Sequence, residues 1–447
     1  MLKHALGYAM RPGPNLFSIT IILFLVKDSL SRSVESADYD FEEAHVGLII
    51  SPVVSSNEVR QIEVYWRNPN FRSGDVIALF ASDPSENVQP LWTYTPKTRN
   101  GIQKTRIEAD FMPTENLTFQ QQCLTHYVAW LRNGIIKKTN CLKTRPNWMH
   151  DRRHFLGPLR IRDVFLPGTH DSVAYSKIPG SIYDTLVTKY VITQDEDILS
   201  QLIYGVRYLD IRVGHYPNTE ELWWGNHGFV QIRPLQTVIN DVKTFLANTQ
   251  EIVIFDIHEF PIGFGKNLSI HHKLVNYLEK ELDEYIIPKS YGWSSNLDKI
   301  WSSGRKLIIG YDLQAIVATR NSVWTCVTHQ WGNVRTVGDL YAHLNKIEAR
   351  ALRLLNSRFI NTVPRSAMAE LTPNTWDVIL DRLGGLRKMA EEININITTW
   401  YSTQWQHSAN IVAVDFIKGS GIIETAIEWN EKRYQFAGNS TISPVRI

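Results

Sequence analysis

The sequence predicts an α/β protein of two domains, a (β/α)8 TIM-like barrel preceded by a small all-β sandwich. The chain has 447 residues, which is too long for one small domain and suits two. Short apolar runs separated by turn clusters fill the first third of the chain, and apolar runs alternate with longer mixed segments after it. We therefore expect a sandwich over residues 38–147 and a barrel over residues 151–447.

The expected sandwich contains five short strand-like runs. Turn-forming residues separate them, for example at Asn68-Pro69-Asn70 and Arg99-Asn100-Gly101, and such spacing is typical of a sandwich. A polar stretch at Arg145-Pro146-Asn147 marks the linker to the second domain. The runs are Val46–Ser51, Ile62–Trp66, Val76–Phe80, Leu91–Tyr94 and Tyr127–Leu131.

The barrel region contains eight candidate strands with helical segments between several of them. Two of these helices are expected at Leu235–Asn248 and Ile270–Tyr285. The region has about 295 residues, which fits a barrel whose usual size is about 250. The candidate strands are Val164–Leu166, Tyr208–Ile211, Leu222–Trp224, Ile252–Ile257, Leu307–Tyr311, Trp324–Val327, Ile397–Tyr401 and Ile411–Phe416.

The amino terminus has the pattern of an export signal. Lys3 and Arg11 precede Leu16–Val26, a run of eleven residues without a charge. A membrane span needs about 20 apolar residues, so this run is too short to cross a bilayer. Small residues at Val34–Ala37 suit cleavage, so we expect a signal peptide over residues 1–37 and a secreted protein. The alternative is an uncleaved segment that anchors the protein to a membrane.

Further features agree with export. Four glycosylation sequons begin at Asn116, Asn267, Asn396 and Asn439, so the sequence predicts a glycoprotein. Of the three cysteines, Cys123 and Cys141 could pair in an oxidising compartment. Cys326 lies in an apolar run and is expected to be a buried thiol.

The overall charge excludes one class of partner. The formal net charge is only +2, so the sequence gives no indication of nucleic-acid binding or of membrane binding through a polybasic segment. The sequence does not predict an oligomeric state.

Polar residues follow several of the candidate strands at the point where each strand ends. Active sites of parallel barrels form at the carboxyl ends of the strands, and packing does not require polar residues there. The sequence therefore predicts an active site built from His170, Asp171, Asp210, Arg212, His227, His258 and Asp415.

Three of these residues are the parts needed to cut a phosphodiester without a metal. One of His170 and His227 can remove a proton from an attacking hydroxyl while the other protonates the leaving oxygen. Arg212 offers a planar donor fork to a phosphate whose charge builds in the transition state. Simpler roles stay open, since Arg212 could form a structural ion pair with Asp210 and Asp171 could cap the segment that follows it.

The order of motifs resembles the X domain of phosphatidylinositol-specific phospholipase C. The matching segments lie between about residues 160 and 420, without a recognisable Y, EF-hand, PH or C2 module. The resemblance implies a secreted protein of the type that has an X domain alone, similar to the metal-independent bacterial enzymes. The segments are Pro167–Ser172, Gly205–Arg212, Asn226–Gly228, Glu251–Glu259 and Asn410–Phe416.

The resemblance implies a role for each site residue. His170 would be the general base that activates the inositol 2-hydroxyl, and His227 the general acid that protonates the leaving oxygen. Asp415 would orient His170, and Asp171 would support His227, because a carboxylate fixes the tautomer and stabilises the imidazolium. The residues expected to contact the inositol ring are His258, Glu259, Tyr311 and Trp331.

The resemblance also bears on metal use. Calcium-dependent members hold the ion with an Asn after the first His, a Glu-x-Asp pair and a later Glu, where this chain has Asp171, Asp210, Arg212 and His258. His258 is a poor ligand for calcium, which prefers oxygen, and Arg212 matches the arginine that replaces calcium in the bacterial enzymes. We therefore expect no cofactor, no metal and no calcium requirement.

The leading hypothesis is a phospholipase C-like phosphodiesterase that cleaves inositol phospholipids or glycosylphosphatidylinositol (GPI) anchors at a membrane surface, through a cyclic inositol phosphate. A second hypothesis is a two-histidine glycerophosphodiester phosphodiesterase, but such enzymes hold a metal with a Glu-x-Asp pair where this chain has Asp210-Ile211-Arg212. A third is a catalytically silent barrel that binds lipid headgroups or a protein.

Overall fold

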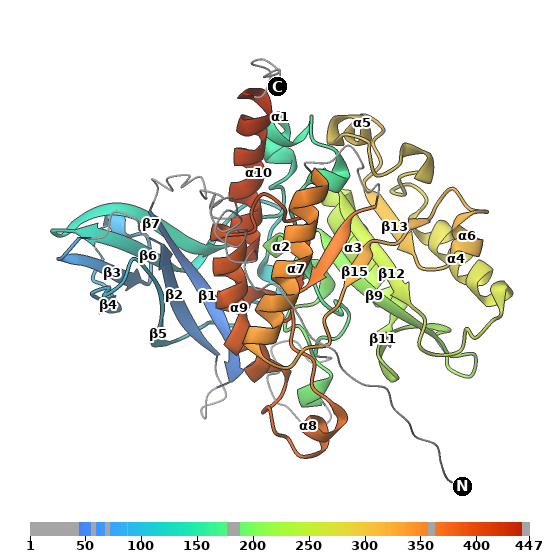
Figure 1. Ribbon diagram of the computed structural model, residues 1–447, viewed down its shortest axis with the longest axis horizontal. Helices are drawn as coiled ribbons and strands as arrows, with labels where there is room; N and C mark the ends of the chain where they lie inside the picture. Colours follow the sequence, from blue (N-terminus) through green and yellow to red (C-terminus); the bar gives the residue numbers. More distant parts are fainter. Residues whose placement is uncertain are drawn as a thin grey trace, which may run out of the picture.

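The computed structural model describes residues 44–54, 60–67, 72–86, 88–176, 188–355 and 363–439. Figure 1 shows a β-sandwich on one side and a larger α/β domain on the other, with two long helices, α9 and α10, between them. None of the helices in these ranges is long and apolar enough to cross a membrane. The expected signal peptide, residues 1–37, lies outside the described residues.

The amino-terminal domain consists of two antiparallel sheets, as predicted. Apolar side chains of one sheet, such as Val64, pack against those of the other, such as Leu79 and Val128. The first sheet has the order β1 (His45–Val54), β2 (Arg60–Arg67), β5 (Asn100–Glu108). The second has the order β4 (Trp92–Tyr94), β3 (Asp75–Phe80), β6 (Cys123–Arg132), β7 (Ile135–Lys143).

Two strands of the sandwich were not predicted, and both are rich in polar residues. β5 and β7 have mostly exposed or half-buried side chains, so they lack the apolar runs by which strands are recognised. β7 contains Cys141, which forms a disulfide bond with Cys123 of β6, the pairing that the sequence allowed. Cys326 is a buried free thiol, as expected.

The second domain is built on a curled sheet of eight parallel strands, which confirms the predicted barrel class. Most of the strands are covered by helices and buried on both faces, and the two at the ends of the sheet, β14 and β15, are partly exposed. Over the described residues β14 and β15 do not pair, so the barrel is open there. The order is β14 (Trp324–Thr325), β13 (Leu307–Tyr311), β12 (Val253–Glu259), β9 (Tyr208–His215), β8 (Leu166–Thr169), β17 (Ile411–Val414), β16 (Arg365–Met368), β15 (Thr328–Gln330).

Two of the eight predicted barrel strands are wrong. Ile397–Tyr401 lies in helix α9 (Leu386–Thr403). Isoleucines alternate there at 393, 395 and 397, but Ile393, Ile397 and Tyr401 are the buried residues, which is a helical spacing. Leu222–Trp224 leads into β10 (Trp223–His227), which pairs antiparallel with β9 and with β11 (Val230–Pro234). The two missing barrel strands are β15 and β16, which are short and partly polar.

The helices include the two that were expected. α3 (Leu235–Asn248) has the predicted bounds and buries Leu235, Val238, Ile239 and Val242 at helical spacing. The others are α1 (Arg153–Leu156), α2 (Ile198–Tyr204), α4 (Leu268–Leu282), α5 (Leu297–Trp301), α6 (Gln314–Val317), α7 (Val337–Leu355), α8 (Thr375–Ile379) and α10 (Ile422–Asn439), with short 3-10 helices η1 (Pro84–Glu86), η2 (Thr114–Asn116), η3 (His150–Arg152), η4 (Ile161–Asp163), η5 (Thr188–Tyr190), η6 (Lys289–Tyr291) and η7 (Ile417–Gly419).

The segment that joins the domains is fixed to the barrel by buried charges. Arg207, at the start of β9, forms an ion pair of 2.6 Å with Glu251 and donates to the carbonyl oxygens of Arg145 and Pro146. Arg145 forms a two-pronged ion pair with Glu424 of α10. The linker is therefore part of the packed structure. These contacts hold the sandwich in a defined position relative to the barrel.

The expected glycosylation sites differ in exposure. Asn116 and Asn267 are exposed. The third sequon lies in α9, where Thr398 is 4% exposed and its hydroxyl donates to the carbonyl oxygen of Asn394. A glycan is bulky and lies at the protein surface, so Asn396, which is half-buried in α9, is the least suited of these three. The side chain of Asn439 lies outside the described residues.

Candidate active site

The carboxyl ends of the barrel strands bring most of the predicted site residues to one place. His170 follows β8, and Asp415 follows β17, the strand beside it. Arg212 lies on β9, and His258 and Glu259 end β12. His227 ends β10, and the hairpin of β10 and β11 places it across from His170.

His170 is held by a carboxylate. Its Nδ1 lies 2.7 Å from Oδ1 of Asp415, a contact made possible because β8 and β17 are paired neighbours. Burial by itself would lower the pKa of His170, but the carboxylates of Asp415 and Glu370 outweigh this effect and raise the pKa to about 10. The Asp415 carboxylate therefore orients the ring and favours its protonated form, and the neutral form that can accept a proton gains population as pH rises towards 10.

Arg212 joins the carboxylates to His170. Its Nη2 lies 2.9 Å from Nε2 of His170 and donates to that nitrogen in the neutral form of the ring, in which Nε2 has a lone pair. Its guanidinium also lies 3.3 Å from Asp171, 3.5 Å from Asp210 and 3.5 Å from Glu259. Burial opposes the charge of Arg212, but these carboxylates raise its pKa and keep it cationic. A fixed positive charge therefore lies beside the His170 ring.

His227 faces His170 with its ring nearly perpendicular. The ring centroids are 6.2 Å apart and the interplanar angle is 86°. Nδ1 of His227 donates to the carbonyl oxygen of Val191 at 2.6 Å, which leaves Nε2 for the reacting group. Asp171, the expected support, lies 3.8 Å from Nε2. The group that orients the ring is thus a backbone carbonyl, with Asp171 as a nearby charge.

Asp171 occupies an unusual backbone position. Its φ is +39°, in the left-handed region that few residues other than glycine adopt, and its backbone N–H donates to Oδ2 of Asp210. Its carboxylate is fully buried and accepts no hydrogen bond from the described residues. Burial raises the pKa of Asp171, and Arg212 and His227 oppose this effect. The negative charge of Asp171 is therefore stabilised mainly by the nearby basic groups Arg212 and His227.

A second group of side chains lies beside Arg212. Nδ1 of His258 is 2.7 Å from Oδ1 of Asp210, and the His258 ring stacks on that of His329 with centroids 3.8 Å apart. Burial would raise the pKa of Asp210, but His258 and Arg212 hold it well below the usual range. The pKa of His258 is raised, because Asp210 outweighs the effect of burial. This is a charged pair next to a stacked imidazole.

Ligand atoms of Asp210, His258 and His329 lie within 4.8 Å of one another, close enough to hold a metal ion. The donor set has two nitrogens and one carboxylate, which does not fit calcium, since calcium takes six to eight oxygens. Arg212 also places a cation 3.5 Å from Asp210. The arrangement therefore fits substrate hydroxyls or phosphate oxygens better than calcium.

Two predicted contact residues lie apart from this group. Tyr311 is 1% exposed, and its hydroxyl bonds to Nδ1 of His271 between the barrel and α4. It belongs to the core, so the prediction that it lines the site is wrong. Its position on β13 suggested the role, but its side chain points away from the mouth. Trp331 is 55% exposed just after β15 and donates to Oγ1 of Thr372, so it lies on the rim.

Two participants were missed. Val191 acts through its carbonyl oxygen, and a backbone group leaves no signal in the sequence. Glu370 follows β16, a strand that was not predicted, and burial raises its pKa to about 7. His329, which stacks on His258, lies on β15, another strand that was not predicted.

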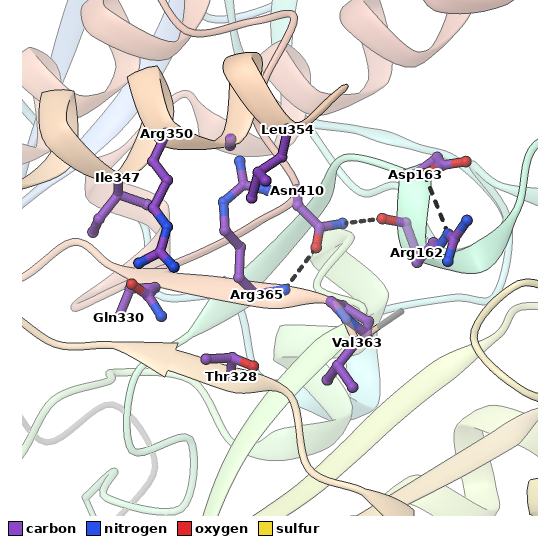
Figure 2. Close-up of a pocket in the computed structure, with 12 residues that line it drawn as sticks. Arg162, Asp163, Thr328, Gln330, Ile347, Arg350, Leu354, Val363, Arg365 and Asn410 are labelled. Carbon is purple, nitrogen blue, oxygen red and sulfur yellow. Dashed lines mark hydrogen bonds and ion pairs between the residues drawn. The ribbon is translucent and has the colours of Figure 1, made fainter. Parts of the chain in front are cut away.

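A separate cavity of about 210 Å³ lies at the opposite end of the strands (Figure 2). Arg350 of α7 and Arg365 at the start of β16 line it. Asn410 joins the walls, since its side chain accepts from the backbone N–H of Arg365 and donates to the carbonyl oxygen of Arg162. It contains none of the predicted site residues.

The raised pKa of His170 makes a prediction about stability. The folded-state value of about 10 is above the ordinary 6.5, so proton binding to His170 stabilises the fold below pH 6.5, and this contribution is lost as pH rises through about 10. The free energy of unfolding of the wild type minus that of His170→Gln should fall over this range, by a few kcal/mol at most. Urea unfolding of both proteins at pH 6 and pH 10 measures this difference. A difference that stays constant or grows with pH would contradict the assignment.

Sequence comparison confirms the resemblance that the motifs indicated. PI-PLC X domain-containing protein 1 of Homo sapiens is 24% identical over 328 residues, covering 67% of this chain and 97% of the relative. The mouse protein of the same name is 23% identical over 314 residues, covering 64% and 86%. Human PI-PLC X domain-containing protein 3 is 23% identical and covers 66% and 94%. No family model matches the chain.

Comparison with solved structures finds bacterial enzymes among the matches. A variant of phosphatidylinositol-specific phospholipase C from Staphylococcus aureus superposes with a TM-score of 0.48 at 16% identity, covering 64% of this chain and 97% of its own. The enzyme from Listeria monocytogenes gives a TM-score of 0.43 at 18% identity, covering 64% and 98%.

Proposed function

We propose that this protein is a metal-independent phosphodiesterase that cleaves inositol phospholipids or GPI anchors. One observation carries the proposal: Arg212 lies 2.9 Å from His170, and His227 faces them across a gap of 6.2 Å between ring centroids. A base, an acid and a cation around one gap are what an in-line displacement at phosphorus needs. The names of the sequence relatives, PI-PLC X domain-containing proteins, support the same activity.

The reaction follows from these positions. The reactive form has a neutral His170. A phosphate that binds Arg212 draws the guanidinium away from Nε2 of this histidine, which then accepts the proton of the inositol 2-hydroxyl. The hydroxyl oxygen bonds to phosphorus while the bond from phosphorus to the diacylglycerol oxygen breaks. His227 donates the Nε2 proton to that oxygen. The products are diacylglycerol and a cyclic inositol 1,2-phosphate, which water opens with the two histidines in reversed roles.

Other observations favour this proposal over the two alternatives. Arg212 lies against Asp171 and Asp210, where a glycerophosphodiester phosphodiesterase would hold its metal. A barrel that only binds ligands would not need the 2.7 Å contact between His170 and Asp415. The disulfide between Cys123 and Cys141 agrees with an oxidising compartment. We therefore propose an extracellular enzyme, for which GPI anchors on the outer leaflet are the more accessible substrate.

The deciding assay incubates the purified protein with phosphatidylinositol vesicles and with a GPI-anchored reporter, with and without EDTA. We expect a cyclic inositol phosphate from the lipid and no loss of rate with chelator. Loss of activity with EDTA and its return with calcium would contradict the metal-independent mechanism. No turnover of either substrate would favour the binding barrel.

Exposed apolar side chains lie at the same end of the barrel as the site. Phe229, in the turn between β10 and β11, is 81% exposed, and Trp376 and Ile379 of α8 are 63% and 61% exposed. Figure 1 shows α8 and β11 at the bottom of the view, at the end opposite α1 and α5. Exposed patches of this kind mark interaction surfaces, and we propose that this one contacts the lipid surface.

We predict that the double substitution Trp376→Ala and Ile379→Ser lowers turnover of phosphatidylinositol in vesicles by about 10-fold, since each buried apolar side chain contributes about 1.5–3 kcal/mol at most. Turnover of a water-soluble short-chain phosphatidylinositol below its micellar concentration should stay within about twofold. Co-sedimentation with vesicles measures the loss of binding directly.

The matched control is Ile135→Ser, which removes an apolar side chain that is 61% exposed on the sandwich, away from the barrel mouth. This variant should bind vesicles as the wild type does. Equal losses in the control and in the α8 variant would contradict a lipid contact at the mouth.

A further inference from the structure

One segment contacts both histidines and also carries buried charges that reach the sandwich. Residues 188–197 begin with η5 and end at the amino end of α2. The carbonyl oxygen of Val191 accepts from His227, and the side chain of Gln194 donates to the carbonyl oxygens of His170 and Val414. This segment therefore forms one wall of the candidate site.

The next residue along the segment, Asp195, is clamped by two arginines. Nη1 of Arg60, the first residue of β2 in the sandwich, lies 2.5 Å from one carboxylate oxygen, and Nη2 of Arg387 in α9 lies 2.6 Å from the other. Arg387 also donates to the carbonyl oxygen of Pro52 in β1. Both guanidinium groups thus tie Asp195 to the sandwich.

The clamp is buried, so water cannot replace it. The side chains of Arg60 and Asp195 are 9% and 7% exposed, and Glu196 beside them pairs with Lys418 at 3.0 Å. Without Arg60, Asp195 keeps only Arg387 among its described ion-pair partners, and Glu196 loses a cation that lies 3.8 Å away. Two buried carboxylates then have less compensating charge, which favours movement of the segment towards water. Only three residues separate Asp195 from Val191, whose carbonyl oxygen orients the His227 ring.

We propose that the amino-terminal sandwich positions the general acid of the barrel, with Arg60 acting through Asp195 and the 188–197 segment on the ring of His227. The kinetic test of this inference rests on the proposed function. The structural test, which measures amide exchange in residues 188–197, does not. Arg60 is a positioning residue in this scheme, since it does not touch the reacting atoms. The sandwich is then part of the catalytic unit.

The experiment compares Arg60→Gln with Arg67→Gln in the full chain. Arg67 is the last residue of the same strand and pairs with Glu428 of α10 at 3.3 Å, so it joins the same two domains without touching the 188–197 segment. Each variant is assayed on phosphatidylinositol and on a water-soluble nitrophenyl ester of inositol phosphate. The nitrophenolate leaves without a proton, so the ester does not need the general acid.

We expect Arg60→Gln to lower kcat on phosphatidylinositol by about 10-fold with little change in KM, and on the nitrophenyl ester by less than about threefold, because a misplaced acid matters only where the leaving group needs a proton. Arg67→Gln should leave the ratio of the two rates unchanged. Equal losses on both substrates in Arg60→Gln, or the same change of ratio in Arg67→Gln, would overturn the proposal. If Arg60→Gln does not fold, Arg60→Lys, which keeps the charge and loses the planar fork, replaces it.

Hydrogen–deuterium exchange tests the role of Arg60 independently of the proposed enzymatic activity. In Arg60→Gln the backbone amides of residues 188–197 should exchange faster than in the wild type, and in Arg67→Gln they should not. If the wild type cleaves neither substrate, the proposed function fails and exchange alone decides. Unchanged exchange in Arg60→Gln would then overturn the inference.

Discussion

Replacing His227 with alanine should lower the turnover of phosphatidylinositol by about 100-fold or more, the usual contribution of a general acid. His170→Ala should cause a loss of the same order, since His170 is the proposed base. The two variants should differ on the nitrophenyl ester of inositol phosphate. His227→Ala should lose much less on this substrate, and His170→Ala should lose as much as before, because the attacking hydroxyl still has to give up a proton. Initial rates on the two substrates measure both effects.

His154→Gln is the matched control, because His154 is exposed in α1 and far from the strand ends that carry the site. Its rates should equal those of the wild type within about twofold. Circular dichroism and thermal unfolding show whether each variant is folded. If both catalytic variants lost the same factor on both substrates, the separate roles of acid and base would be refuted.

Removing the charge of Arg212 should have the other large effect. In Arg212→Met, turnover should fall by about 100-fold to 1000-fold, because the charge that builds on the phosphate loses its donor. The same change leaves Asp171 and Asp210 buried without their shared cation. Breaking such a pair costs about 3–5 kcal/mol, so this variant should also unfold at a clearly lower urea concentration. Steady-state rates and urea unfolding measure the two losses.

Arg212→Lys tests whether the positive charge alone or also the planar guanidinium of Arg212 is needed. Lysine keeps the cation but lacks the planar fork, so we expect most of the stability to return while turnover stays at least about 10-fold low. Arg350→Met is the control, since Arg350 is exposed in α7 at the opposite end of the barrel (Figure 2). Full activity in Arg212→Lys would show that a point charge suffices and that the fork has no part in the reaction.

The site could be predicted more fully than the strands that carry it. His170, Arg212, His227 and Asp415 lie in short motifs whose order is independent of the exact strand bounds, and the structure places all four together. The strand predictions relied on apolar runs, and that rule failed in two ways. The alternating isoleucines of α9 imitate a strand, and β15 is too short and polar to be recognised.

Contacts made by the backbone or by distant residues could not be predicted. The bond from His227 to the carbonyl oxygen of Val191 depends on the path of the chain and on no side-chain type. The clamp on Asp195 joins residues 135 positions apart, Arg60 and Asp195, in two different domains. Tyr311 shows the opposite error, since its place on a barrel strand suggested a site residue but its side chain points into the core. Sequence motifs locate reactive groups well and locate their supports poorly.

The pairing of β8 with β17 has a consequence for biosynthesis. His170 and Asp415 are in contact although they are 245 positions apart along the chain, and β17, which precedes Asp415, is the last strand among the described residues. A ribosome therefore has to release nearly the whole polypeptide before this pair can form. Fragments that end before residue 411 would lack both the partner of His170 and the neighbour of β8, so the pair between His170 and Asp415 belongs to the nearly full-length chain alone.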